Sequence, residues 1–271
     1  SIESSIEYAA LTRLCVSACY DCGARDVVVN YSDDLNTRER FLRADAAVFQ
    51  EYPSYLKARF DWMLEQKCPR LSIVGSDPEL LKEVDPARIQ ARRKASGPPT
   101  KPYFDALTAN RFQWCVGSCP TLPWAEKAFP DKKGQDAIDA LWDAIFSVCR
   151  ITGDGKAVER WKEHVAATAK RAKILNEYQF QTLRYTNSLG TDLTIRLPDN
   201  HVWAGGSDFT PEGVEFVANI PTEEIFTAPL RDGVDGVVCS SMPLVHNGSV
   251  IDGFHMEVKA GKVAAVHAQT G

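Results

Sequence analysis

Several hallmarks of other protein classes are missing from this sequence. None of its apolar runs approaches the length of a membrane span. Residues 1–8 are polar and acidic, without the basic start and apolar middle of a signal peptide. Basic residues form no stripe that could neutralise phosphates, and the net charge is −5. We therefore expect neither nucleic acid nor a membrane as a partner.

Common catalytic motifs are absent as well. The sequence contains no GxSxG, HExxH, Walker or GxGxxG pattern. Its glycine-rich stretches GVDG and AGGSD have the form of turns rather than of a phosphate-binding loop. No internal repeat is present. The sequence pattern thus excludes the usual nucleophile elbow, the zincin helix and the common nucleotide-binding loops.

What the sequence does contain is enough apolar material for a large core. Hydrophobic residues make up 44% and charged residues 25% of the chain, which is the composition of a soluble globular protein. It has eight cysteines, most of them in apolar periodic segments where a free cysteine packs as a small hydrophobe. A chain of 271 residues needs no disulfides for stability, so we expect reduced cysteines and a cytoplasmic location.

Strand and helix patterns alternate over the first part of the chain. Ser4 to Glu7 has the form of a capping box that starts a first helix, with no strand before it. Apolar runs typical of buried strands occur at 24–31, 70–77 and 111–121. Helical spacing predicts helices at 34–47, 54–66, 78–95, 123–129, 134–148 and 155–176, with a proline-rich loop at 96–102. This alternation predicts an open, mostly parallel α/β sheet over residues 1–178.

From Gln179 on, only strand and turn patterns occur. Strands are predicted at 191–197, 214–220 and 236–242, and a hairpin joins 254–258 to 262–268. We therefore predict a second, β-rich domain over residues 179–271. The chain stops at Gly271 directly after a strand, so we expect this domain to be truncated.

Two groups of cysteines could carry chemistry. Cys15, Cys19 and Cys22 share one helix face, but a structural zinc site needs a fourth ligand. Their shared face is apolar, so core packing is the better interpretation. Cys115 and Cys119 lie where a predicted strand ends, the usual place for ligands in an open α/β sheet. A reactive thiol fits that position, but a plain structural turn is the better interpretation.

His164 and His201 lie in segments with little sign of chemistry. His164 borders the apolar stripe of its helix, so we expect it at the surface or half-buried. His201 precedes Trp203 in a predicted turn.

His255 and His267 lie on the two arms of the predicted hairpin. If Val258 pairs with Lys262, the two histidines are diagonal neighbours on one face. Two histidines and a glutamate could form a zinc site. Nothing in the sequence brings Glu224 to this pair.

The segment NIPTEEIFTAP (219–229) contains two adjacent carboxylates, Glu223 and Glu224. A buried carboxylate is costly unless it has a partner. If the segment is extended, the two side chains point to opposite faces and cannot easily serve one site. One is then functional or ion-paired and the other solvated, and periodicity does not say which.

The same segment resembles the signature of the M29 family of metallo-aminopeptidases, the aminopeptidase T, AmpS and PepS group. Other segments are similar to the family in matching order: GARDVVVNYSDD (23–34), PTLPWAEKAFP (120–130), LGTDLTIRLPDNHVWAGG (189–206) and GKVAAVHAQTG (261–271). The resemblance covers nearly the whole chain and is most specific over 189–230.

This resemblance implies a hydrolase that removes N-terminal residues from peptides with a free N-terminus. It implies two divalent metal ions, zinc or cobalt with magnesium or manganese as alternatives, and a homodimer whose metal site lies in the β-rich domain. The first metal-ligating glutamate of the family directly precedes Ile/Val-Phe-Thr, which corresponds to Glu224. The position before it varies in the family, which fits a solvated Glu223.

The resemblance also implies that the other metal ligands and the catalytic residues lie beyond Gly271. They belong to a second glutamate, a His…Tyr pair and a His-x-Asp motif, which neither His255 nor His267 matches. We therefore expect this chain alone to be inactive. Two other functions stay open: a non-catalytic α/β ligand-binding or assembly module, and an α/β hydrolase or redox enzyme that uses Cys115 or Cys119.

Overall fold

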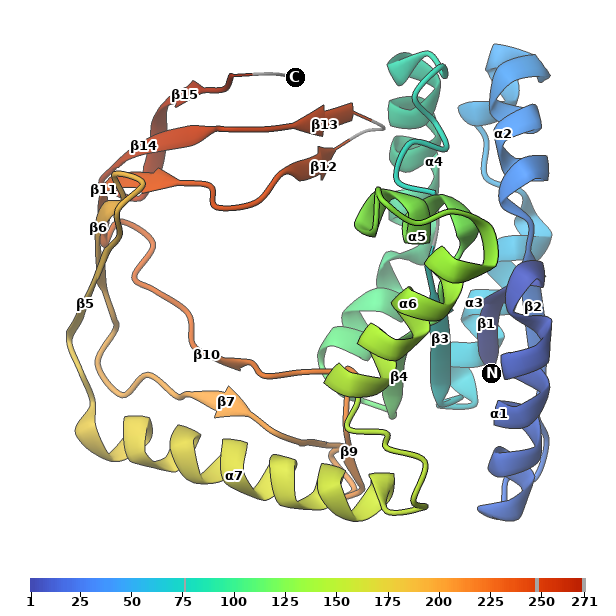
Figure 1. Cartoon of the computed structure of the whole chain (residues 1–271), viewed down its shortest axis with the longest axis horizontal. Coiled ribbons are helices and arrows are strands. Elements are labelled where there is room, and N and C mark those ends of the chain that lie inside the picture. The colour runs from blue at the N-terminus through green and yellow to red at the C-terminus, as the bar shows by residue number, and fades with distance from the viewer. Residues whose placement is uncertain (76, 247–248, 270–271) are drawn as a thin grey trace. The chain divides into compact units, whose positions relative to one another are not determined.

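The computed structural model describes residues 1–75, 77–246 and 249–269, and these form two compact units (Figure 1). The first unit contains Ser1–Trp161 and Ser207–Thr222, and the second contains Lys162–Gly206 and the residues from Glu223 on. A domain division after residue 178 remains a prediction. The two compact units are instead divided after Trp161, Gly206 and Thr222. Helix α7 (Ala157–Tyr178) belongs mostly to the second unit, and residues 207–222 return to the first.

A parallel sheet with intervening helices forms the first unit. Its elements up to residue 148 are β1 (Ile2–Ser5), η1 (Ile6–Tyr8), α1 (Ala9–Asp21), β2 (Val29–Ser32), α2 (Asp34–Arg43), η2 (Ala46–Phe49), α3 (Ser54–Glu65), β3 (Arg70–Val74), α4 (Pro86–Thr108), β4 (Trp114–Ser118), α5 (Leu122–Ala128) and α6 (Gly134–Val148). The strands run in the order β2-β1-β3-β4 and all pair in parallel. The predicted open parallel α/β sheet is confirmed.

Strand β1 shows that the expectation of no strand before the first helix was wrong. Ile2 is 1% exposed and packs in the apolar cluster that includes residues of α1. Ser4 is also buried, and its hydroxyl lies 2.8 Å from Oγ1 of Thr12, so this polar atom has a partner. The predicted capping box fails too, because Ser5 accepts the hydrogen bond from the backbone N–H of Glu7.

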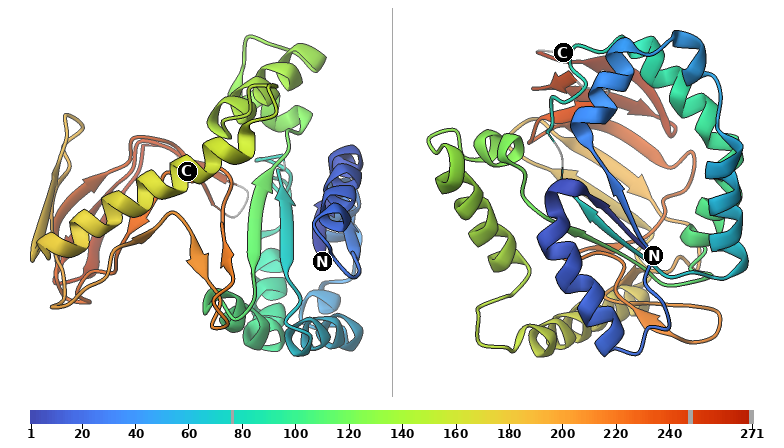
Figure 2. Two further views of the ribbon diagram at one scale, coloured as in Figure 1. Left: turned by 90° about the horizontal axis from the view of Figure 1, so that it is seen from below. Right: turned by 90° about the vertical axis from the view of Figure 1, so that its right-hand side faces the viewer.

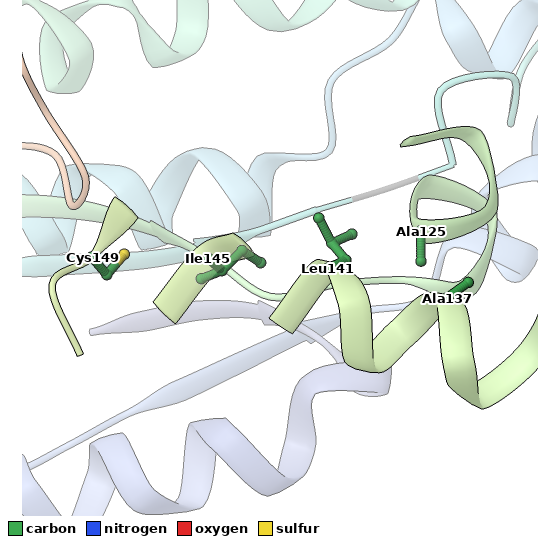
Figure 3. Close-up of a cluster of buried hydrophobic side chains, with 5 residues drawn as sticks. All are labelled: Ala125, Ala137, Leu141, Ile145 and Cys149. Carbon is green, nitrogen blue, oxygen red and sulfur yellow. The ribbon is translucent and has the colours of Figure 1, made fainter. Parts of the chain in front are cut away.

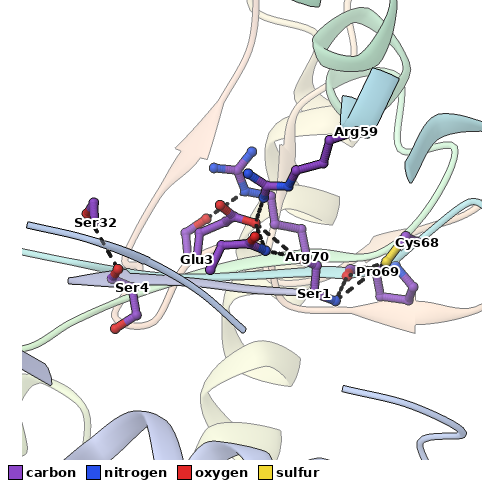
Figure 4. A network of polar contacts seen from close by, with 10 residues as sticks. Ser1, Glu3, Ser4, Ser32, Arg59, Cys68, Pro69 and Arg70 are labelled. Carbon is purple, nitrogen blue, oxygen red and sulfur yellow. Dashed lines mark hydrogen bonds and ion pairs between the residues drawn. The ribbon is translucent and has the colours of Figure 1, made fainter. Parts of the chain in front are cut away.

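The opposite face of β1 carries an ion pair (Figure 4). Side chains alternate along a strand, so Glu3 points away from Ile2, toward Arg59 of α3. The Glu3 carboxylate also accepts hydrogen bonds from Ser1 Oγ at 2.9 Å and Asn30 Nδ2 at 3.2 Å. The central strand is therefore covered on both faces, by apolar packing on one and by a satisfied carboxylate on the other.

Helix α4 continues through the stretch predicted as the loop 96–102, so that prediction was wrong. Pro98, Pro99 and Pro102 lie inside the helix, where each removes a backbone donor. The hydroxyl of Thr100 donates to Ser96 O at 2.8 Å. The carbonyl of Ser96 therefore has a side-chain hydrogen bond within this proline-rich stretch. Tyr103 is 1% exposed and packs with Met63 of α3. Burial of this face outweighs the local cost of the prolines.

Helices α5 and α6 share a small core of their own (Figure 3). Leu141, Ile145 and Cys149 follow the 3.6-residue period along one face of α6 and its end. Ala125 of α5 is fully buried against them, and Ile220 of the returning segment packs on the same cluster. The returning segment contains a hairpin of β8 (Asp208–Phe209) and β9 (Glu215–Phe216). Strand β9 is much shorter than the strand predicted at 214–220.

The second unit is an antiparallel sheet accompanied by α7. Its strands are β5 (Thr182–Thr186), β6 (Asp192–Arg196), β7 (Ala204–Gly205), β10 (Ile225–Phe226), β11 (Val234–Cys239), β12 (Leu244–His246), β13 (Ser249–Ile251), β14 (His255–Lys259) and β15 (Lys262–His267). Five of them form one sheet in the order β15-β14-β11-β6-β5, drawn from yellow to red in Figure 2. Within the described residues, everything after α7 in this unit is strand, turn or irregular chain, as predicted.

None of the helices in the described part of the chain has a stretch that is both long and apolar enough to cross a bilayer.

Candidate functional site

The candidate metal ligand Glu224 directly precedes strand β10. Residues Ile225 and Phe226 of β10 pair antiparallel with Gly205 and Ala204 of β7. This pairing confirms an extended chain at 225–226. The strand is only two residues long, so the opposite orientation of Glu223 and Glu224 remains a prediction.

A glycine permits the close approach of these two strands. A Cβ atom built on Gly205 would lie 2.6 Å from the carbonyl oxygen of Glu224 and 3.1 Å from the Cα of Ile225. Real Cβ atoms do not come so close to a backbone oxygen, so only glycine fits without displacement. Beyond the strand, the hydroxyl of Thr227 donates to Val202 O at 2.8 Å and continues the contact. The backbone of Glu224 is thus positioned by the AGG stretch at 204–206.

The AGG stretch is held in turn by helix α7. Gly206 has φ +95°, and a Cβ atom there would lie 3.0 Å from Val165 O. Asn176 binds the neighbouring backbone in both directions, since its Nδ2 donates to Trp203 O at 2.9 Å and its Oδ1 accepts from Trp203 N at 2.7 Å. Sequence analysis treated AGGSD as a turn and missed this role, although two successive glycines were a visible signal.

His164 of α7 also reaches the acidic segment. Its Nε2 lies 3.6 Å from Oε2 of Glu223. The His164 side chain is 8% exposed and the Glu223 side chain 64% exposed. The residue as a whole is half-buried, as predicted. Glu223 faces solvent as predicted, and the neighbouring His164 ring is a partner that sequence analysis did not identify.

The described residues do not by themselves surround Glu224 with a ligand set. Glu224 is exposed, and no group of three or more His, Cys, Asp or Glu side chains that could hold a metal ion occurs among the residues in the described ranges. A protein zinc site uses three or four such ligands. Around Glu224, the described part of this chain therefore offers a single candidate ligand rather than a complete metal centre.

His255 and His267 lie opposite each other rather than diagonally, which corrects the predicted register. Lys259 pairs with Lys262, and a bulge between Glu257 and Val258 shifts the register by one residue. His255 and His267 consequently form a direct cross-strand pair. Their rings are stacked, with centroids 4.8 Å apart and an interplanar angle of 21°.

His201 is a buried histidine with a structural partner. It is 6% exposed, and its Nδ1 lies 3.0 Å from Pro198 O. Its ring contacts the edge of the Trp203 ring at a centroid distance of 6.1 Å. The predicted turn is confirmed, and the histidine is part of the packing beneath it.

The two thiols singled out for chemistry are poor nucleophiles. Burial, with a smaller contribution from the neighbouring thiol of Cys15, raises the pKa of Cys115 to about 11. Burial is also the main cause that raises the pKa of Cys119 to about 11, with Cys15 and Glu7 adding to it. A reactive cysteine needs a depressed pKa, because the thiolate is the attacking species. Burial and the raised pKa values argue against an enzyme that uses either thiol.

The remaining cysteines serve mostly as packing groups. All eight are free. Cys15 and Cys19 pack on the cluster formed by Ile2 and Ile73, as the apolar helix face predicted. Cys22 is exposed, so the expectation that it shares the buried face was wrong.

The first unit contains a cavity of about 790 Å³. Its walls include Ile2, Leu71 and Trp114, which stand at or near the amino ends of β1, β3 and β4. Ligands of open α/β sheets bind at the carboxyl ends of the strands. The cavity therefore lies at the wrong end of the sheet for a ligand site of that kind.

Comparisons with known proteins give matches along the whole chain. A family model described as "Thermophilic metalloprotease (M29)" matches residues 1–271. The chain is 40% identical to "Aminopeptidase PepS" of Streptococcus thermophilus over 272 residues and 38% identical to "Aminopeptidase 2" of Geobacillus stearothermophilus over 270 residues, with 100% of this chain and 65% of each relative covered. A solved structure of "Wild-type AmpT from Thermus thermophilus" superposes with a TM-score of 0.90 at 30% identity, covering 100% of this chain and 66% of that one. The chain thus spans about two thirds of the length of these relatives.

Proposed function

The chain belongs to the M29 metalloprotease family, and from this premise we propose that the whole protein is a metal-dependent aminopeptidase acting on peptides with a free N-terminus. The relatives named aminopeptidases support this proposal, since they match the chain along its entire length. The observation that carries the proposal is the placement of Glu224. This residue is exposed, and its backbone is held by the pairing of β10 with β7 and by the close approach of Gly205.

Glu224 is proposed as one ligand of the metal centre. Two divalent ions are proposed, with zinc or cobalt favoured by the family resemblance and magnesium or manganese as alternatives. When bound, such ions polarise a peptide carbonyl and activate water for hydrolysis. The contribution of this chain's own residues is positional. Gly205 allows the close strand contact, and Thr227 anchors the chain beyond β10.

The 271-residue chain alone is proposed to hydrolyse no peptides. One carboxylate cannot hold a catalytic metal ion against water, because such a site takes about three protein ligands. No group of three or more potential ligands exists within the described residues. The α/β unit has a four-stranded hydrogen-bonded sheet, so it is expected to fold.

Two further properties of the whole protein are proposed, its oligomeric state and its compartment. A homodimer follows from the family resemblance, and exposed apolar side chains on strand β15, Val263 and Val266, are compatible with a partner surface. The eight free cysteines suit a reducing compartment such as the cytoplasm.

The test compares the whole protein with the 271-residue chain. Turnover of a leucine-linked chromogenic substrate is measured with added cobalt or zinc. We expect metal-dependent turnover by the whole protein only, and its loss by orders of magnitude in Glu224→Ala, together with weaker metal retention. Undiminished turnover in Glu224→Ala would overturn the assignment of this ligand. Metal-dependent turnover by the 271-residue chain would show a site that Glu224 alone does not explain.

The competing proposal of a non-catalytic binding module is distinguished by the same assay. If the whole protein with its metals shows no turnover of any N-terminally free peptide but binds peptides, the binding function is favoured. A thiol-dependent enzyme would lose activity on alkylation of Cys115 or Cys119, an outcome that their raised pKa values argue against.

A further inference from the structure

We propose that His255 and His267 form a binding site for one divalent transition-metal ion, of the zinc and nickel class, on the hairpin β14–β15. This site does not include Glu224. Three observations carry the proposal: the direct cross-strand pairing of the two residues, the spacing of their rings, and the exposure of one of them.

The register brings two imidazoles to one point. His255 on β14 pairs with His267 on β15, so both side chains leave the same face of the sheet. This pairing depends on the bulge between Glu257 and Val258, without which the two residues would be offset by one position. Bulges commonly re-aim a side chain near a functional position.

The ring spacing matches what a shared metal ion requires. Two imidazoles bound to one tetrahedral zinc at about 2.0–2.1 Å have centroids about 5 Å apart. The observed separation is 4.8 Å. The stacked orientation, with 21° between the ring planes, must change so that two ring nitrogens converge. The required rotation is about χ2, a broad torsion in histidine, and His267 is exposed and free to turn.

The chemical class of the ion follows from the donors. Neutral imidazole favours zinc, nickel and copper, whereas magnesium and calcium favour oxygen ligands. Cys239 on β11 pairs with His255, on the side of β14 away from His267. It lies two strands from His267, about 9–10 Å away at the usual strand spacing, so one ion between the histidines cannot also bind this thiol. Water completes the coordination.

Nickel and zinc are the probes, because copper(II) would oxidise exposed thiols such as Cys22. The 271-residue chain is titrated with each ion by calorimetry, and the midpoint of thermal unfolding is recorded with and without the ion. We expect one ion per chain, and a rise of the unfolding midpoint, because the site exists only when the hairpin is paired. Magnesium should give neither effect.

Variants locate the site. We expect His267→Gln and His255→Gln each to weaken nickel and zinc binding about tenfold or more. His267 is exposed, so its variant tests the site even if His255→Gln impairs folding, which circular dichroism would reveal. His246→Gln, at an exposed histidine of β12, and Cys239→Ser are the matched controls and should bind as the unaltered chain does.

The outcomes separate this inference from the proposed function. Unchanged binding in His267→Gln overturns the site. Loss of binding in Cys239→Ser or Cys22→Ser assigns the ion to a thiol and overturns it as well. Loss of binding in Glu224→Ala assigns the ion to the acidic segment and again overturns it. Retained binding in Glu224→Ala supports the site whether or not the whole protein proves to be an aminopeptidase.

Discussion

His164 Nε2 lies 3.6 Å from Glu223 Oε2, joining a buried side chain of helix α7 to an exposed carboxylate next to Glu224. The AGG stretch contacts the same helix through Gly206 and the same acidic segment through Gly205. Helix α7 therefore supports the candidate ligand in two ways, through the β7 backbone and through the Glu223 side chain. Glu223 contacts the helix with its side chain, whereas Glu224 is positioned through its backbone. We therefore expect the two adjacent glutamates to have different roles.

Replacing Glu223 with alanine in the whole protein should have a mild effect. Glu223 is 64% exposed, so its contact with His164 contributes no more to stability than the roughly 0.2–1 kcal/mol of an exposed ion pair. We expect the catalytic efficiency to fall by about tenfold at most, far less than in Glu224→Ala. The measurement is kcat/KM and metal content for both variants. Equal losses would show that Glu223 also acts at the metal centre.

Gly205→Ala should weaken the second unit. The new Cβ atom would lie 2.6 Å from Glu224 O, and strands that must separate to relieve such a contact lose about 1–3 kcal/mol. Amide hydrogen exchange of residues in β7 and β10 should accelerate, and the activity of the whole protein should fall with it. The control is Gly97→Ala on an exposed face of helix α4, where a Cβ atom meets nothing within 4 Å. That change should leave stability unchanged or raise it by about 0.5–1 kcal/mol. Equal exchange rates in Gly205→Ala and the unaltered protein would contradict the close contact.

Much of the architecture was predictable because helices and buried strands carry local periodic patterns. The runs at 70–77 and 111–121 became β3 and β4, and the stripe at 155–176 became α7. The fold class followed from the alternation of these patterns. Strand β1 was missed because Ile2 is its single apolar residue and its other two buried residues, Ser4 and Ser5, are polar.

The candidate site was less predictable, because its support comes from residues far apart in the sequence. Sequence resemblance pointed to Glu224, but no local pattern pairs His164 with Glu223 or brings Gly205 against Glu224. The prolines of α4 illustrate the same limit. Their local preference against a helix interior is overridden by the burial of Tyr103 against α3, which the sequence does not display.

Arg59→Met should destabilise the first unit by about 2 kcal/mol, since hydrogen bonds to charged groups contribute about 1.5–3 kcal/mol. The change leaves Glu3, which is 20% exposed, without its cationic partner. The check is the midpoint and slope of urea unfolding. The control is Arg43→Met: Arg43 is 81% exposed and pairs with Glu39 one helical turn away, so its loss should change stability by less than about 0.5 kcal/mol. Similar effects from both changes would mean that the Glu3 pair contributes no more than a surface pair.

Native Cys115 and Cys119 should react slowly with alkylating reagents at neutral pH. Both have a pKa raised to about 11, mainly by burial, and only the thiolate reacts. Their reaction rates should rise about tenfold per pH unit up to pH 11, whereas the exposed Cys22 should be modified first at every pH. Mass spectrometry of partially labelled protein gives the order of modification. Under denaturing, non-reducing conditions all eight thiols should react, and a count of two or fewer would show disulfides instead.

The same pKa shifts predict a loss of stability at alkaline pH. Unfolding returns each thiol toward its ordinary pKa of 9.0, so above that pH the unfolded chain releases protons that the folded chain retains. The stabilisation is complete below pH 9 and is lost as the pH rises toward 11, because folding then requires each thiolate to take up a proton. Cys115→Ala and Cys119→Ala should each flatten the fall in the free energy of unfolding over this range. A pH dependence identical to that of the unaltered chain in both variants would show that the buried thiols do not titrate with folding.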